Sequence, residues 1–467
     1  MYSKMYFLIT LIMLSSLNHI MGALDSDTSD QGGDDKFSAF HKLCSLVRWL
    51  KSFYLKIRYI LGVSCSTQSD QDFQPTIFHV KGTHHSIGVQ IGQKFKTMIK
   101  DFLASYTSLP AYLKAYNTPE GRAIYDDSLT SSMKYFPQYV RELQGMASGA
   151  DVEFHVLFLV LLDDTLTMNM PNATPKDAGP VGCTSILVNQ EEFQALGHNE
   201  DALKETSGHY YIISANVKAA DDEKGGTFKP RDENWKAVVY AASLPGYASG
   251  VNANGVAYSI NTIFASKQPR RKIPRGMITR ALLSAKADLN DIIEILTNDR
   301  CVRGDSCGTA DAFNVNLGFF DPELTGGKRI FYNLEVTPDK DNARSIVSLA
   351  TISAGHNGLH INKLLYSGYA EIPDHSGVIS SVAKTKRYRQ LTKDNPITDM
   401  DGVLRVLGDT DPTTEWQIFR SRPGDFVYTI HTGVIDFTKK IWYIWPKNPR
   451  AENVTPIEIR LTFDDQN

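Results

Sequence analysis

Residues 182–201 open with Gly182-Cys183-Thr184-Ser185-Ile186 and close with Gly197-His198-Asn199-Glu200-Asp201. A cysteine that follows a small residue and leads an apolar, strand-like run is typical of a nucleophile that becomes a new chain N-terminus. Scission between Gly182 and Cys183 would free an α-amino group beside the thiol. Because the reference pKa of an α-amino group is about 7.7–8.0, a small shift leaves it neutral near pH 7 and able to act as the base for its own thiol. The alternative is that Cys183 is a small buried hydrophobic residue.

The composition is that of an ordinary soluble protein. The chain has 467 residues, of which 42% are hydrophobic and 22% charged, and its formal net charge is -3. This length suffices for one large or two medium domains. The near-neutral charge gives no reason to expect nucleic acid as a partner.

Residues 1–22 predict a secretory signal peptide. Lys4 supplies the positive charge, Met5–Leu17 is largely apolar, and Gly22 and Ala23 offer small residues for cleavage. The apolar run is short for a membrane span, although an uncleaved anchor is the alternative. We therefore expect a protein of the secretory pathway, either secreted or lysosomal.

Residues 23–75 predict an acidic linker followed by a basic amphipathic pro-segment. Residues 24–35 carry five aspartates among Gly and Ser, a composition typical of disorder. Residues 41–63 combine five Lys and Arg side chains and no acidic one with large apolar residues in a helical pattern. Such a helix could contact an anionic membrane surface, dock on the folded body or be discarded, and we favour the last two.

The five cysteines bear on the role of Cys183, because an odd number in an oxidising compartment leaves one thiol unpaired. Spacing would pair Cys301 with Cys307 and Cys44 with Cys65, which leaves Cys183 free. Asn172 and Asn453 each begin an Asn-x-Thr sequence, so both are possible glycosylation acceptors that require exposed positions.

The predicted secondary structure changes from helices to strands along the chain. Helices are predicted from Ile87 onward, over Phe136–Ala150 and over Val152–Leu166. In the first of them Gly88 and Gly92 lie four residues apart on one face and permit close helix packing. Residues 168–180 are rich in Pro and Gly and are predicted to form a loop that leads to the proposed scission point.

After Cys183 most elements are strands. Two helices are predicted, over Ile273–Ala287 and Leu289–Thr297, the second capped by Asp288. The predicted strands are Thr184–Asn189, Tyr210–Asn216, Ala237–Ala242, Val256–Ile263, Phe313–Phe320, Arg329–Glu335, Ser345–Leu349, Val427–Asp436 and Lys440–Tyr443. Helices first and strands afterwards favour the α+β class, with sheets packed face to face and helices outside.

A set of motifs in a fixed order then points to a family. They are Lys81-Gly82-Thr83-His84-His85-Ser86-Ile87-Gly88, Phe136-Pro137-Gln138-Tyr139 with Glu142-Leu143-Gln144-Gly145, Gly182-Cys183-Thr184-Ser185, Gly197-His198-Asn199-Glu200-Asp201, Gly250-Val251-Asn252-Ala253-Asn254-Gly255 with Ile260-Asn261, and Pro274-Arg275-Gly276. In this order the chain resembles the penicillin acyltransferase family of self-processing N-terminal-nucleophile (Ntn) hydrolases, which includes the β-alanyl-dopamine hydrolases.

The resemblance implies an αββα four-layer sandwich built from one precursor. Residues 76–182 would form a mostly helical α-chain and residues 183–467 a β-chain, together one domain. It also implies cleavage or transfer of the acyl group of an N-acyl amide, a small-molecule substrate, through a cysteine thioester. No cofactor and no metal are expected.

The resemblance assigns roles to three residues. Cys183 is the nucleophile. Asp201 matches the acid that holds the new α-amino group, where a carboxylate would orient the amine and stabilise its charged form; a turn or cap residue is the alternative. Asn261 aligns with an asparagine that donates to the oxyanion of the tetrahedral intermediate, or it is a strand-end residue.

Further candidates rest on looser matches. His198 stands where related families often carry arginine, so its charge would depend on pH. The hydroxyls of Thr184 and Ser185 could assist the amide-to-thioester shift, or these are plain strand residues. Asn357 is an oxyanion candidate from His356-Asn357, and Arg422, in Ser421-Arg422, is either a site residue or a surface arginine.

Other chemistries lack their motifs. The sequence has no HExxH, no paired CxxC, no Gly-x-Ser-x-Gly and no Walker A motif. Two alternatives to a small-amide hydrolase stay open: a lysosomal lipid amidase similar to acid ceramidases, and a secreted binding protein that keeps the fold without turnover.

Overall fold

The computed structural model describes residues 73–170, 182–223, 225–298, 307–339, 344–423, 425 and 427–463. All of them belong to one compact unit, Asp70–Asn467. The predicted signal peptide, the segments at 24–35 and 41–63 and residues 171–180 of the predicted loop lie outside the described residues, as do Cys44, Cys65, Cys301 and Asn172. Met168, the first residue of that predicted loop, is the last residue of a helix.

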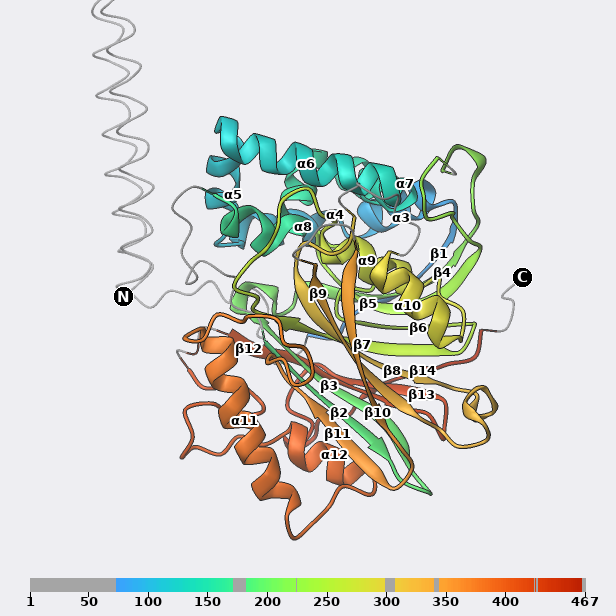
Figure 1. Cartoon of the computed structure of the whole chain (residues 1–467), viewed down its shortest axis with the longest axis vertical. Helices are drawn as coiled ribbons and strands as arrows, with labels where there is room; N and C mark the ends of the chain where they lie inside the picture. The colour runs from blue at the N-terminus through green and yellow to red at the C-terminus, as the bar shows by residue number, and fades with distance from the viewer. Residues whose placement is uncertain are drawn as a thin grey trace, which may run out of the picture. The chain divides into compact units, whose positions relative to one another are not determined.

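Two β-sheets lie face to face, with helices on both outer sides (Figure 1). The larger sheet has the order β1 (Ile77–Gly82), β4 (Tyr210–Val217), β5 (Glu233–Tyr240), β6 (Ser249–Asn252), β7 (Val256–Ile263), β8 (Ala312–Phe319), β9 (Phe331–Pro338) and β10 (Ser345–Ile352). The smaller sheet has the order β11 (His356–His360), β2 (Gly182–Asn189), β3 (Gln194–Leu203), β12 (Val427–Asp436), β13 (Ile441–Trp445) and β14 (Ile457–Arg460). The β1–β4 pair is parallel and the other paired strands are antiparallel.

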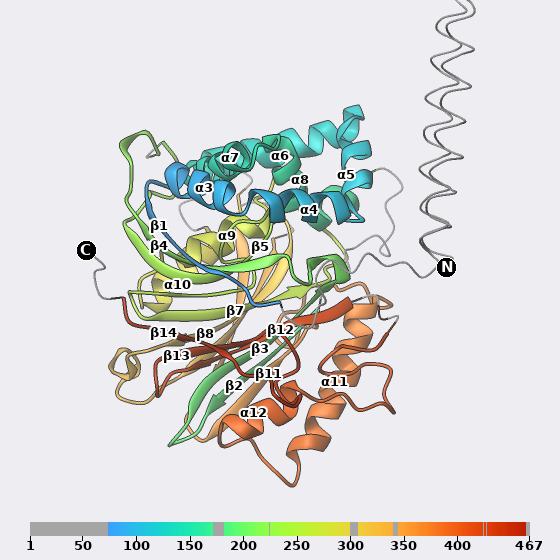
Figure 2. The ribbon, with the colours of Figure 1, turned by 180° about the vertical axis from the view of Figure 1, so that it is seen from behind.

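Helices form the two outer layers, as the view from behind also shows (Figure 2). The larger sheet is covered by α3 (His84–Lys94), α4 (Lys96–Ser105), α5 (Leu109–Tyr116), α6 (Pro119–Tyr135), α7 (Pro137–Ala150), α8 (Phe154–Met168), α9 (Arg275–Leu282) and α10 (Leu289–Thr297). The smaller sheet is covered by α11 (Ser376–Thr392) and α12 (Met400–Leu407).

The buried apolar residues form one hydrophobic core at each interface between neighbouring layers. One joins the helices to the larger sheet, a second lies between the sheets, and a third joins the smaller sheet to α12. Because side chains alternate along a strand, Leu187 of β2 enters the core between the sheets, whereas Ile186 and Val188 enter the core next to α12. The predicted α+β class and the αββα four-layer sandwich are confirmed.

Helices α3 and α7 approach each other closely through glycines. A Cβ added at Gly88 would lie 2.0 Å from the carbonyl oxygen of Glu142, and one at Gly92 would lie 2.2 Å from that of Met146. Gly145 and Gly149 of α7 are equally tight against α3. The predicted role of Gly88 and Gly92 in close packing is therefore confirmed.

Several predicted elements match the structure, and some do not. Val256–Ile263, Val427–Asp436 and Leu289–Thr297 have the predicted bounds, and the Asp288 side chain caps its helix by accepting from the Asn290 N–H. The helix predicted over Ile273–Ala287 spans only Arg275–Leu282, because the residues after it turn by i to i+3 hydrogen bonds.

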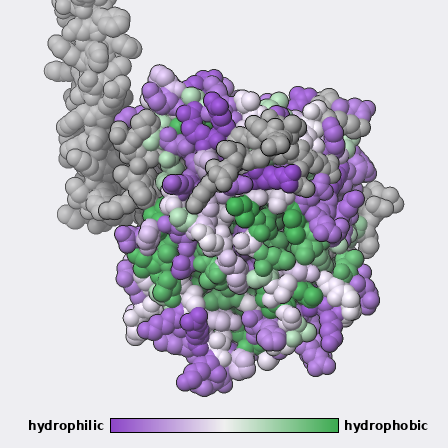
Figure 3. All heavy atoms as spheres, viewed as in Figure 1, coloured by the Kyte–Doolittle hydropathy of each residue, from purple (hydrophilic) through white to green (hydrophobic). Residues whose placement is uncertain are grey.

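The surface carries apolar side chains in the middle of the face seen in Figure 3. On the edge strand β10, Ile346 and Leu349 are 47% and 44% exposed. Asn453 is exposed, as a glycosylation acceptor requires. Within the described part of the chain, no helix has the length and apolar character needed to cross a membrane.

Candidate active site

Cys183 lies near the start of β2, and strand alternation sets what surrounds it. It pairs with Glu200 of β3, while Gly182 pairs with Asp201. The side chain of Cys183 therefore points toward the larger sheet, and Asp201 lies on the opposite face, beside α11. Cys183 is a free cysteine and only 2% exposed.

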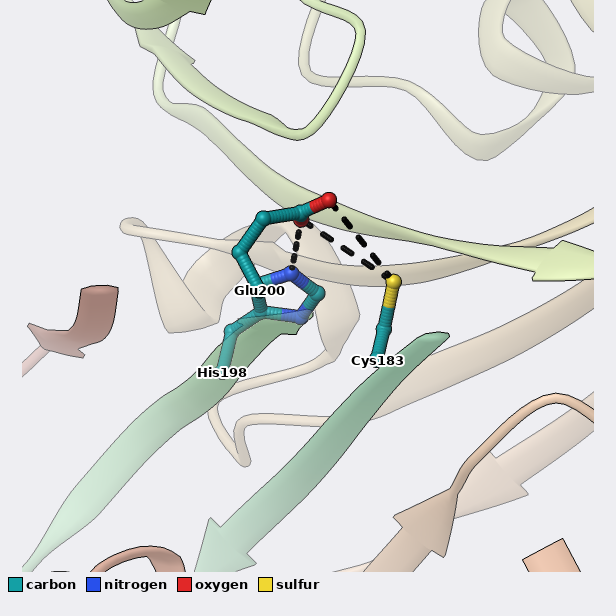
Figure 4. Close-up of side chains that lie close together, drawn as sticks. All are labelled: Cys183, His198 and Glu200. Atoms are coloured by element: carbon teal, nitrogen blue, oxygen red, sulfur yellow. Dashed lines mark hydrogen bonds and ion pairs between the residues drawn. The ribbon is translucent and has the colours of Figure 1, made fainter. Parts of the chain in front are cut away.

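On the side facing the larger sheet, the Glu200 carboxylate lies next to the thiol (Figure 4). Its oxygens are 4.0 Å and 3.9 Å from Sγ of Cys183. His198 Nε2 donates to Glu200 Oε2 over 2.8 Å, and its Nδ1 lies 2.8 Å from the Ser185 hydroxyl. With Nε2 protonated toward the carboxylate, Nδ1 accepts from Ser185. The chain of contacts fixes the position of the carboxylate beside Sγ.

The same cluster contains the donor atoms that a metal ion would need. One ligand atom each from Cys183, His198 and Glu200 lie within 4.8 Å of one another. A thiolate, an imidazole and a carboxylate suit Zn²⁺. Binding an ion there would occupy the thiol, so such a site competes with a nucleophilic role for Cys183.

The surroundings oppose ionisation of the thiol in the uncut chain. Burial, followed by the carboxylates of Glu200 and Asp201, raises the pKa of the Cys183 thiol well above its usual value. The backbone N–H of Thr262 and the charge of Arg275 act in the opposite direction but do not outweigh these effects. The thiol is therefore protonated near neutral pH and needs a base before it can attack.

Asn362 holds the peptide nitrogen of Cys183. Its Oδ1 accepts from the Cys183 N–H over 2.9 Å, and its Nδ2 donates to the Thr262 carbonyl over 2.9 Å. The second bond fixes which way the amide points. Sequence reasoning missed Asn362. The signal was a second asparagine directly after Leu359-His360-Ile361, beyond the Asn357 that was chosen.

Asp201 lies behind the Gly182–Cys183 peptide in a buried ion pair. Lys384 Nζ of α11 is 2.6 Å from Asp201 Oδ2, and Thr429 donates to Oδ1 over 2.6 Å. A Cβ added at Gly182 would lie 3.3 Å from Asp201 Oδ2, so the carboxylate adjoins the backbone at the proposed scission point. Lys384 also donates to Thr184 over 3.4 Å. Nothing in the sequence distinguished Lys384 from a surface lysine.

Asn261 faces the space between the sheets. Its Oδ1 lies 3.1 Å from the Ser185 hydroxyl oxygen and accepts from Asn316 Nδ2 over 2.6 Å. Its Nδ2 lies 3.5 Å from the His360 carbonyl oxygen. The amide thus lies beside Ser185, two residues along β2 from Cys183. The neighbouring Thr262, by contrast, directs its backbone N–H at the thiol.

Two looser candidates lie elsewhere. Asn357 pairs with Val188, five residues along β2 from Cys183 and therefore about 16 Å away at ~3.3 Å per residue. Its amide bonds to Gln190 and to the Ile397 carbonyl, so the oxyanion prediction for Asn357 is wrong. Arg422 donates to the carbonyls of Pro412 and Thr414 and supports its own loop. The structure does not bring Arg422 to Cys183.

A buried arginine at the start of α9 adjoins the site. Arg275 donates to Thr262 Oγ1 over 2.9 Å and to Asp163 over 3.1 Å, and it also contacts the Tyr247 hydroxyl. Asp163 has φ 40° inside α8, a conformation that costs a residue with a side chain roughly 1–3 kcal/mol. The carboxylate of Asp163 is thus already neutralised by Arg275, unlike that of Glu200.

Comparison with known proteins finds a matching family and a similar hydrolase. Residues 188–451 match the family described as acyl-coenzyme A:6-aminopenicillanic acid acyl-transferase. The chain is 34% identical over 377 residues to the β-alanyl-dopamine/carcinine hydrolase of Drosophila melanogaster, covering 80% of this chain and 93% of that protein.

Two solved structures are similar to this chain at lower sequence identity. A mutant of conjugated bile acid hydrolase from Clostridium perfringens is 13% identical with a TM-score of 0.34, covering 59% of this chain and 92% of that one. Penicillin V acylase from Agrobacterium tumefaciens is 10% identical with a TM-score of 0.35, covering 59% and 86%.

Proposed function

The chain belongs to the acyl-coenzyme A:6-aminopenicillanic acid acyl-transferase family, and we propose that it cuts itself between Gly182 and Cys183 and then opens an N-acyl amide with the Cys183 thiol. Membership makes the chain an enzyme of the amidohydrolase and acyltransferase class. One observation carries the proposal: a free, buried thiol belongs to the residue whose backbone nitrogen is held by Asn362 and whose preceding residue adjoins Asp201.

Self-cleavage begins with the thiol of Cys183 attacking the carbonyl carbon of Gly182. The C–N bond between them breaks, the nitrogen leaves as an amine after taking up the thiol proton, and a thioester links Gly182 to Sγ. Water then opens the thioester, giving the Gly182 carboxylate and a free thiol beside a new α-amino group.

The mature site repeats the chemistry on a substrate. The neutral α-amine takes the thiol proton, and Asn362 Oδ1, which accepts from this nitrogen in the uncut chain, orients its lone pair. Sγ attacks the substrate carbonyl carbon, the substrate amine leaves with the proton, and water or another amine takes the acyl group. The backbone N–H of Thr262 lies beside Sγ, where it can donate to the developing oxyanion. Asn261 is the second donor that we propose.

For the substrate, we propose a short aminoacyl amide of the kind named for the Drosophila relative, β-alanyl-dopamine. A lipid amide and a silent binding protein are the alternatives. The 34% identity to that hydrolase along 93% of its length supports the first over both.

The test is the chemical state of the purified chain. After denaturation and reduction, the wild-type protein should yield a fragment that begins Cys183-Thr184-Ser185 and has 467 − 182 = 285 residues. Cys183→Ala should stay in one piece and open no amide, and Cys183→Ser should cut more slowly than wild type. Hydrolysis by Cys183→Ala, or full activity of a wild-type chain still joined at this bond, would refute the proposal.

A further inference from the structure

We propose that Glu200 selects the acyl group: its carboxylate binds the ammonium of a short aminoacyl amide while Cys183 attacks the carbonyl of that amide. The inference rests on the proposed function and adds a specificity residue to it. It starts from the position of a buried carboxylate directly against the reacting thiol.

The Glu200 carboxylate is placed as an anchor. Both oxygens lie within 4.0 Å of Sγ of Cys183, and the side chain is 4% exposed. His198 holds Oε2 from one side, and Ser185 in turn holds His198. The carboxylate therefore cannot swing away, and Oε1 faces the thiol at 4.0 Å.

A second polar group lies beside it. Tyr240 is a buried tyrosine of β5 in the larger sheet, 8% exposed. Burial, then the charge of Glu200 and a hydrogen bond to it, raise the pKa of the Tyr240 hydroxyl well above its usual value, which places this hydroxyl against the carboxylate. With its proton directed at Glu200, the Tyr240 oxygen keeps its lone pairs for an incoming donor, and an ammonium brings three N–H donors. Glu200 and Tyr240 together supply acceptors for such a group.

The charge of Glu200 also needs this partner for catalysis. A carboxylate 3.9 Å from Sγ repels the thiolate and so opposes the attack. His198 donates to one oxygen of Glu200, and the nearby Arg275 is already paired with Asp163. A substrate ammonium at Glu200 cancels the repulsion at the moment when the thiol must ionise. A cationic substrate should therefore have both a higher kcat and a lower KM than an uncharged substrate.

The spacing limits the length of the acyl group. With bonds of about 1.5 Å, the ammonium of a β-aminoacyl group lies about 3–4 Å from its carbonyl carbon. That carbon bonds to Sγ, so the nitrogen falls within hydrogen-bonding reach of a carboxylate oxygen 3.9 Å from the sulfur. A 6-aminohexanoyl chain, extended over about 7–8 Å, carries its ammonium past the carboxylate.

The experiment compares amides of one amine that differ only in the acyl group. In wild-type enzyme, kcat/KM for the β-alanyl amide should exceed that for the uncharged propionyl amide by about 100-fold. In Glu200→Gln, this ratio should fall to within about threefold of unity. Because both rates come from one preparation, the ratio is independent of the fraction of enzyme that is folded and cleaved.

Two further variants complete the design. Glu200→Asp keeps the charge and retracts it by one methylene, so the preferred acyl group should shift from β-alanyl to γ-aminobutyryl. Asp163→Asn removes another carboxylate near the site, one that is paired with Arg275, and the β-alanyl to propionyl ratio should stay within about threefold of wild type.

The outcomes separate the two proposals. If wild type cuts itself and opens both amides without preference, or if Glu200→Gln keeps the preference, the role of Glu200 is refuted and the proposed function stands. If Glu200→Gln fails to mature, an unchanged length optimum in Glu200→Asp refutes the role. If wild type neither cuts itself nor opens any amide, the proposed function fails and this inference with it.

Discussion

Lys384 Nζ lies 2.6 Å from Asp201 Oδ2, and the two side chains are 1% and 0% exposed. The pair sits on the face of the smaller sheet that looks toward α11, directly behind the strand that carries Cys183. Thr429 satisfies the other carboxylate oxygen. A charged pair this deeply buried depends on both partners, because removal of one leaves the other charge without compensation.

Lys384→Met should therefore lower the free energy of unfolding by about 3–5 kcal/mol and slow self-cleavage. Urea unfolding and the rate of fragment appearance on reducing gels measure the two effects. The control is Lys386→Met, an exposed position in the same helix, which should change stability by less than about 0.5 kcal/mol. Adding Asp201→Asn to Lys384→Met should restore much of the stability without restoring activity. Equal behaviour of the two lysine variants would contradict this account.

Asn362→Ala removes the acceptor for the Cys183 N–H. We expect self-cleavage to slow about 10–100-fold, the effect of losing one buried hydrogen bond of 1–3 kcal/mol. A time course of the fragments gives the rate. Asn357→Ala is the matched control, since its amide bonds far from Cys183, and its cleavage rate should equal that of wild type. Slow cleavage in both variants would indicate a general loss of folding.

Gly88→Ala should destabilise the contact between α3 and α7. The added Cβ would lie 2.0 Å from the Glu142 carbonyl oxygen, so the helices must separate, at a cost of about 3 kcal/mol or more. Gly368→Ala, where the added Cβ meets nothing within 4 Å, is the control. Thermal unfolding followed by circular dichroism should show a lower midpoint only for Gly88→Ala; a wild-type midpoint there would show that the helices can shift freely.

A buried charge network makes stability depend on pH. Burial alone would lower the pKa of His84, but hydrogen bonds to Glu223 and Glu233 raise it from 6.5 to about 9. Burial alone would raise the pKa of Glu233, but Arg280 and His84 lower it from 4.5 to about 2. The His84 contribution is complete below pH 6.5 and lost as pH rises through 9. The Glu233 contribution is complete above pH 4.5 and lost as pH falls through 2.

Both contributions are therefore complete between about pH 4.5 and 6.5. His84→Gln should be less stable than wild type in this window by about 3 kcal/mol, and the difference should shrink as pH approaches 9.5. Chemical unfolding at pH 5.5, 7.5 and 9.5 would measure it. His85→Gln, at the exposed neighbouring position, should follow wild type at each pH. A difference that grows with pH would overturn the sign assigned to His84.

Strands with ordinary apolar patterns could be predicted from the sequence. A strand that carries buried polar residues of the candidate site could not. Val256–Ile263 is apolar enough to read directly, and the helix Leu289–Thr297 carries its cap in Asp288. β3 escaped prediction because Gly197-His198-Asn199-Glu200-Asp201 buries polar side chains on both faces, which no hydrophobic alternation reveals.

The site itself was partly readable. Cys183 and Asp201 stand in a recognisable order along the chain, whereas Lys384 and Asn362 become site residues only through contacts with residues more than 170 positions away. α11, which carries Lys384, has the polar sequence Ser376-Gly377-Val378-Ile379-Ser380-Ser381 and no clear apolar stripe. Its buried lysine looks in sequence like any solvated one.

Because side chains alternate along β2 and β3, two sets of polar residues lie on opposite faces of the smaller sheet. Glu200 and His198 share the face of Cys183, while Asp201 and Lys384 lie on the other face. Substitutions on the first face can therefore accumulate without disturbing the ion pair on the second. Among enzymes descended from a common ancestor, we expect those with different amide preferences to diverge at Glu200 and Tyr240 and to retain Lys384 and Asp201.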